Sequence, residues 1–185
     1  MSYCVVRTDK PSGEAQMADM ISLNFYTTSG SGNNITYTPA QVENGVIVEL
    51  KGLDVDASSN AKHEIYRAVA ATSSSDLNNC AIVCSPEVMY DERIHGLDKF
   101  INPANKPCRG YILRSRNIYS WTADGFVSGT APTTIGSAIG IGTGGKLATS
   151  VSSGATTLGT YIDTDVAGRY TYYTVEIGKT ELAGS

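Results

Sequence analysis

The feature that most constrains the fold of this chain is the spacing of its apolar residues. In the runs Val46–Leu50 (VIVEL) and Thr171–Ile177 (TYYTVEI), alternate positions carry apolar side chains, and no long segment repeats with the period of a helix. Alternate side chains of a strand point to opposite faces, so this spacing is typical of strands. Segments rich in Gly, Ser and Asn, such as 29–34 (SGSGNN), separate the runs and predict turns. We therefore expect a mainly β protein with at most short helical turns.

The runs fall into two groups, which predicts two small β modules of sandwich or barrel type. Strand-like runs at 21–26, 46–50, 63–70 and 80–84 place a first module at residues 21–93. Runs at 111–121, 155–165 and 168–178 place a second module at residues 110–185. The run 111–121 carries apolar groups on both faces and predicts one strand that is covered on both sides. Residues 1–20 have weak periodicity, and we expect a loosely held N-terminal arm there.

Residues 94–109 join the two modules, and we expect them to form an ordered connector. Leu97 to Ile101 could form one helical turn, which Asn102 and Pro103 would end. The charged block before it suits internal anchoring, with Arg93 pairing a carboxylate, and contact with a partner is the alternative. The predicted structural connector residues are Tyr90, Asp91, Glu92, Arg93, Asn102 and Pro103.

Charge and hydropathy argue against two classes of partner. The formal net charge is −4 and only 17% of the residues are charged, so the basic footprint of a nucleic-acid-binding protein is missing. Aromatic and basic residues between 109 and 121 could bind RNA, but strand packing with a solvated charged edge explains them better. The start of the chain has no apolar run long enough for a signal peptide or a spanning helix. We expect a soluble protein made in a cytosol, with no nucleic-acid or membrane partner.

The four cysteines predict reduced thiols and no disulfide framework. Cys80 and Cys84 are separated by three residues, which is neither a zinc pair nor a redox motif. In a strand, two such residues lie about 13 Å apart, too far for a bond. We expect Cys4, Cys80, Cys84 and Cys108 to be mostly buried and free.

No arrangement of residues in the sequence indicates catalysis. His63 and His95, the two histidines, have no Cys, His or paired carboxylate at metal-ligand spacing. The Gly-rich run 135–147 lacks the Gly-Lys-Ser/Thr ending of a phosphate-binding loop and predicts turns with a short strand. No nucleophile elbow of the G-x-S-x-G type is present. We expect no enzyme, no metal and no cofactor.

Several short segments resemble one family. They are Glu43-Asn44-Gly45 before a strand, 63–68 (HEIYRA), 88–93 (VMYDER), the linker Leu97–Pro103, 109–111 (RGY) and the closing run 168–177. Together they are similar to capsid decoration proteins of tailed bacteriophages. That resemblance implies a non-enzymatic subunit bound outside an icosahedral shell, with the major capsid protein as partner. It also implies a homo-oligomer or contacts with several shell subunits, and a place on the virion exterior after synthesis in the host cytoplasm.

Tyrosines and the N-terminal residues are the candidate contact elements. Tyr170 and Tyr172 would face outward, whereas the alternate residues of the last strand, Thr171 to Ile177, would face inward. The candidate capsid-contact residues are Tyr3, Met17, Met20, Tyr170 and Tyr172. Two further hypotheses stay open: a tail or fibre component that contacts a host glycan through exposed Tyr, and a small-molecule enzyme.

Overall fold

The computed structural model describes residues 2–8, 19–32, 34–55, 64–86 and 97–178. Strands dominate this part of the chain, and its helical elements are single 3-10 turns, as the alternating pattern predicts. The predicted block Tyr90 to Arg93 and the predicted contact residue Met17 lie outside the described residues. No described helix is long and apolar enough to span a bilayer.

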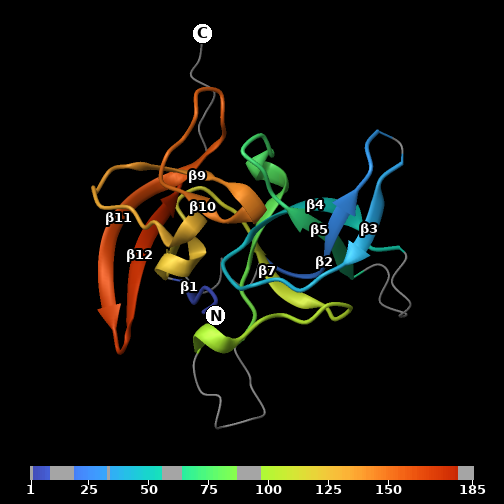
Figure 1. Cartoon of the computed structure of the whole chain (residues 1–185), viewed down its shortest axis with the longest axis horizontal. Helices are drawn as coiled ribbons and strands as arrows, with labels where there is room; N and C mark the ends of the chain where they lie inside the picture. Colours follow the sequence, from blue (N-terminus) through green and yellow to red (C-terminus); the bar gives the residue numbers. More distant parts are fainter. Residues whose placement is uncertain (1, 9–18, 33, 56–63, 87–96, 179–185) are drawn as a thin grey trace.

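The strands form two six-stranded sheets that lie beside each other (Figure 1). The first sheet contains β2 (Met20–Ser29), β3 (Thr36–Pro39), β4 (Ile47–Leu53), β5 (Ile65–Ala70), β6 (Cys80–Val83) and β7 (Cys108–Ile112). The second contains β1 (Val6–Thr8), β8 (Ile118–Trp121), β9 (Ala138–Ile141), β10 (Leu147–Ala148), β11 (Thr157–Ala167) and β12 (Tyr170–Ile177). The 3-10 turns are η1 (Leu77–Asn79), η3 (Leu97–Lys99), η4 (Ala123–Gly125), η5 (Val127–Gly129) and η6 (Thr143–Gly145).

The first sheet closes on itself as a barrel. Its order is β3-β2-β5-β4-β6-β7, and β2 also pairs with β7, so that β2, β5, β4, β6 and β7 make a ring. Strand β2 can do this because it is long: Met20 to Leu23 pair with β7, while Tyr26 to Ser29 pair with β3 on the same side. Leu23, Val48, Ala68 and Val83 fill the inside of the ring and are buried.

A second apolar core joins the barrel to the other sheet. Ile47, Cys80 and Ile82 on the outside of the barrel pack with Trp121 and residues of β9, β11 and β12. Hydrogen bonds cross the same boundary: the Trp121 indole N–H donates to the Gly45 carbonyl at 2.9 Å, and the Thr156 amide donates to the Ser73 carbonyl at 2.7 Å. The two sheets therefore share one continuous apolar contact.

Two segments pair differently from what the sequence predicts. The run 111–121 is not one strand: β7 completes the barrel, β8 belongs to the second sheet, and the chain turns between them where Arg116 has φ 66°. The prediction of a loosely held N-terminal arm is also wrong for residues 2–8. Val6 to Thr8 pair with β8, and Cys4, Val5 and Val6 are buried. The predicted module boundary at 109/110 thus lies inside β7 and does not separate the sheets.

Three other local predictions agree with the structure. Leu97–Lys99 forms the single helical turn expected in the connector. The Gly-rich run forms β9, η6 and β10, which are turns and short strands. Cys80 to Val83 are fully buried, as a short apolar strand should be.

No disulfide joins the four cysteines, and three of them, Cys4, Cys80 and Cys108, are buried. Burial raises the pKa of Cys80 and of Cys108 to about 12, so almost no reactive thiolate exists near neutral pH. We expect iodoacetamide at pH 8 to modify Cys84, which is half-buried, well before the other three. Mass spectrometry of the native protein measures this, and denatured protein, in which all four should react, is the control. A stoichiometric disulfide without reductant would contradict the prediction.

Candidate functional site

Two of the predicted contact residues, Tyr3 and Tyr170, gather at one place, around Asp98 in the turn η3. The Tyr170 hydroxyl donates to an Asp98 carboxylate oxygen at 2.9 Å, and the Tyr3 amide donates to the Asp98 carbonyl at 2.8 Å. Arg169 forms an ion pair with the same carboxylate. The hydrogen bond from Tyr170, followed by the cationic neighbours Lys99 and Arg169, lowers the pKa of Asp98 to about 2. Asp98 is therefore a charged anchor that ties the connector to the end of β12.

Aromatic rings and guanidinium groups extend from this anchor along the face of the second sheet. The Arg169 guanidinium lies 4.9 Å from the centre of the Tyr170 ring, and the Tyr170 and Tyr172 rings meet edge to face at 6.2 Å. Arg7 from β1 closes the series, 4.3 Å from the centre of the Tyr172 ring. We call these four residues the Arg–Tyr stack. Cation–π contacts of this kind hold both partners in one geometry.

Two predictions about the burial of β12 residues are wrong. Tyr172 lies on the face opposite Tyr173 and Val175, as expected, but it is only 4% exposed because Arg7 covers its ring. Thr171, which the alternation predicts inward, is exposed near the hairpin end. Of the predicted tyrosines, Tyr3 and Tyr170 are half-exposed and remain accessible at the surface.

Met20, Asn102 and Pro103 lie together at a different place, beside the barrel. Met20 is 43% exposed, and all three line a hollow next to β7. Asn102 is buried and anchors the connector: its side-chain amide donates to the Val42 carbonyl and to the Asn44 amide oxygen, each at 3.0 Å. Asn102 thus ties the connector to residues 42–44.

The sequence patterns did not indicate a cluster on the outside of the barrel. The Asp54 carboxylate is fully buried and accepts hydrogen bonds from Asn24 at 2.8 Å, from Tyr26 at 2.7 Å and from Arg67 at 3.3 Å. Burial alone would raise its pKa, but these donors outweigh burial and lower it. Arg67 also lies 4.5 Å from the centre of the Tyr37 ring. The bulge in β4 after Leu50 shifts the pairing of β4 with β5, and neither apolar periodicity nor spacing marks that bulge.

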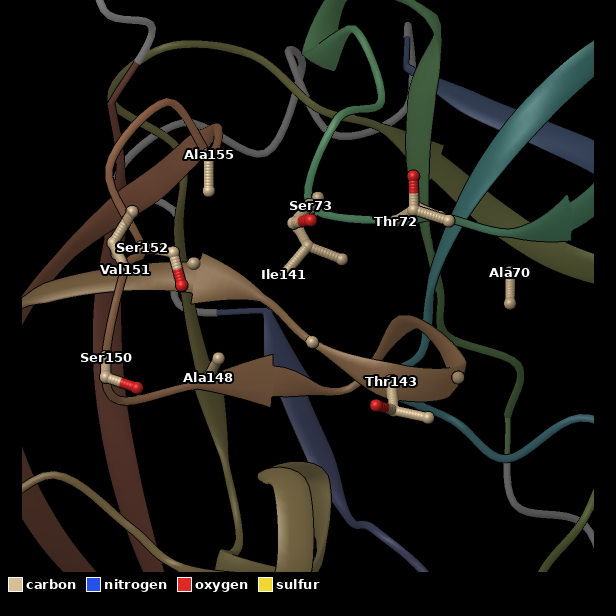
Figure 2. A pocket seen from close by; sticks show the side chains of 14 residues that line it. Ala70, Thr72, Ser73, Ile141, Thr143, Ala148, Ser150, Val151, Ser152 and Ala155 are labelled. Carbon is tan, nitrogen blue, oxygen red and sulfur yellow. The ribbon is translucent and has the colours of Figure 1, made fainter.

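A further hollow of about 490 Å³ lies between the loop after β5 and the β9–β10 hairpin (Figure 2). Figure 2 shows Thr72 and Ser73 on one side of it and Ser150 and Ser152 on the other. The described lining carries no charged side chain, so it offers hydroxyl and backbone groups but no acid–base pair. The described residues also include no group of three or more His, Cys, Asp or Glu that could hold a metal ion.

Comparison with known proteins adds no relative: no family model, no curated protein and no solved structure matches the chain. The contacts described above therefore carry the functional argument.

Proposed function

We propose that this protein is a non-enzymatic decoration subunit, bound to the outer surface of a tailed-phage head, where it stabilises the shell. The observation that carries the proposal is the Arg–Tyr stack with its anchor Asp98. Tyr and Arg are the residue types that contribute most often to binding energy at protein interfaces. Here they are held in place before any partner binds, by ring contacts and by the Asp98 hydrogen bonds. The major capsid protein is the proposed partner.

A rigid surface suits this role on physical grounds. Binding two preformed surfaces costs little side-chain entropy, because few groups must be ordered. Attachment as a homo-oligomer, or to several shell subunits at once, raises the overall affinity without one large interface. The subunit would act on the capsid exterior of the virion after synthesis in the host cytoplasm. We also propose a two-module arrangement with one β module around each sheet, although the two sheets share a core.

A tail or fibre subunit that contacts a host glycan is the second candidate, and one observation favours it. Tyr26 and Tyr37 are half-exposed on the outside of the barrel, next to Asn24 and Arg67. Aromatic faces beside amide and guanidinium donors can bind a sugar ring and its hydroxyl groups. This cluster is separate from the Arg–Tyr stack, so each candidate function has its own residues to test.

The decoration proposal predicts saturable binding to empty shells that lack the protein. The bound amount should reach a fixed ratio to the major capsid protein, measured by sedimentation of the shells and densitometry. Replacing Tyr170 with alanine and Arg169 with glutamate together should weaken this binding at least about tenfold, because a contact residue and the local charge are lost. A deletion of residues 1–20 is unsuitable as a test, since it removes β1 from the core.

The matched control replaces Tyr37 with alanine and Lys51 with glutamate, both outside the stack. This variant should bind shells like the parent protein, and circular dichroism should show that both variants keep their strands. If the parent protein shows no saturable binding, and purified particles carry it only on tails, the decoration proposal fails. The Tyr37 variant should then lose binding to glycans if the second candidate is correct.

A further inference from the structure

A groove beside the barrel has the features of a peptide-binding surface. It has a volume of about 460 Å³ and lies where β2 and β7 pair, next to the residues that follow η3. Met20, Phe100 and Pro103 supply apolar lining, and Met20 is one of the few large apolar side chains with substantial exposure among the described residues. Methionine adapts its shape to different apolar partners, and both methionine and aromatic residues are enriched in the centres of interfaces.

The floor of the groove is held rigidly by buried hydrogen bonds. Asn44 and Ser85 bond to each other twice: the Asn44 amide donates to the Ser85 carbonyl at 2.9 Å, and the Ser85 N–H donates to the Asn44 oxygen at 3.0 Å. The Ser85 hydroxyl accepts from the Arg109 N–H at 3.0 Å. Asn102 donates to the same Asn44 oxygen, so loop and barrel are tied together. A ligand would therefore meet a preformed surface, which lowers the entropy cost of binding.

The charged residues of the groove indicate which kind of ligand it would bind. Lys106 and Arg109 are the charged residues among its described lining, and both are exposed. No carboxylate is part of that described lining, although the whole chain carries a net charge of −4. A local cationic rim beside an apolar floor is complementary to a segment with acidic and apolar side chains.

We propose that this groove binds a short extended peptide segment of a partner protein, with an apolar side chain over Met20 and Phe100 and carboxylates beside Lys106 and Arg109. Two cations favour a peptide over a nucleic acid, because a nucleic-acid site neutralises many phosphates in a row. The inference does not depend on the proposed function, since it rests on the groove and not on the Arg–Tyr stack.

The test is a selection of random twelve-residue peptides displayed on yeast against the purified full-length protein. Enriched peptides should combine Asp or Glu with large apolar residues. One enriched peptide, synthesised with a fluorescent label, then serves as the probe in anisotropy titrations. Reversing both charges, Lys106→Glu with Arg109→Glu, should weaken its binding at least about tenfold, and Met20→Ser should weaken it severalfold. Binding should also fall as salt is raised.

The matched control makes the same change of charge elsewhere, Lys51→Glu with Arg116→Glu, at residues that do not line the groove. It should leave the affinity of the probe unchanged. The proposal is overturned if enriched peptides are basic or if the groove variants bind them as the parent does. It is also overturned if the protein binds a labelled single-stranded oligonucleotide through Lys106 and Arg109, or if Met20→Ser abolishes self-association instead of peptide binding.

Discussion

Replacing Trp121 with alanine is expected to lower the free energy of unfolding by roughly 3–5 kcal/mol, the usual cost of removing a large buried aromatic side chain. Trp121 is fully buried where the barrel meets the second sheet, and its ring contacts Tyr119 at 5.9 Å between centroids. Its N–H also satisfies the Gly45 carbonyl, which would lose its donor. The loss therefore combines a cavity with an unpaired buried acceptor.

The surroundings show why the cavity should stay open. A Cβ atom placed on Gly45 or on Gly125 would lie 2.8 Å from the indole Cδ1 atom, so both backbones approach the ring closely. Hydrogen-bonded turns fix the backbone at Gly45 and at Gly125. This backbone therefore cannot easily shift to fill the space that the indole leaves. Guanidinium unfolding followed by fluorescence of the tyrosines and by circular dichroism measures the change. Trp121→Phe, which keeps most of the volume, is the matched control, and a loss below about 1 kcal/mol for the alanine variant would contradict the prediction.

Replacing Gly145 with alanine should be almost as damaging, with an expected loss of about 3 kcal/mol or more from backbone strain and steric clash together. Gly145 has φ 74°, a conformation that alanine adopts only with strain. Its added Cβ would lie 2.2 Å from the Ile47 carbonyl oxygen. Because that atom belongs to backbone of β4, it cannot move aside as a flexible side chain can. The turn η6 would be pushed away from the barrel.

The neighbouring residue provides a control for the strain alone. Gly144 has φ 69°, and a Cβ added there meets nothing within 4 Å. Gly144→Ala should therefore cost only about 1 kcal/mol, the price of the left-handed conformation. Thermal and guanidinium unfolding of the two variants compares them directly. If both variants lose the same amount of unfolding free energy, the steric clash between η6 and β4 does not cause the loss at Gly145, and the prediction is wrong.

The sequence predicts the local strands better than their partners. Alternation indicates β2, β4 and β12 because it depends only on residues that are neighbours in the sequence. The break between Leu113 and Ile118 escapes prediction because both sides carry apolar residues, while the turn at Arg116 uses a conformation that no glycine marks. The short β1 escapes it because three residues give too little periodicity to measure.

The candidate sites could likewise be predicted only in part from the sequence. Tyr3 and Tyr170 could be proposed from residue type and position, and the structure brings them together at Asp98. The burial of Tyr172 could not be predicted, because it depends on Arg7 from a strand at the other end of the chain. The Asp54–Arg67 pair depends on a bulge and on cross-strand register, which are tertiary properties.

The exchange of strands between the two sheets has a consequence for synthesis of the chain. The barrel cannot close until β7 follows β2 by some ninety residues, and β1 has no partner until β8 has been made. Pairings between distant residues form slowly because a long loop must close first. A nascent chain that has just passed residue 109 therefore holds an open barrel edge and an unpaired N-terminal strand. We therefore expect folding to be completed late, after β8 and the strands that follow it have been made.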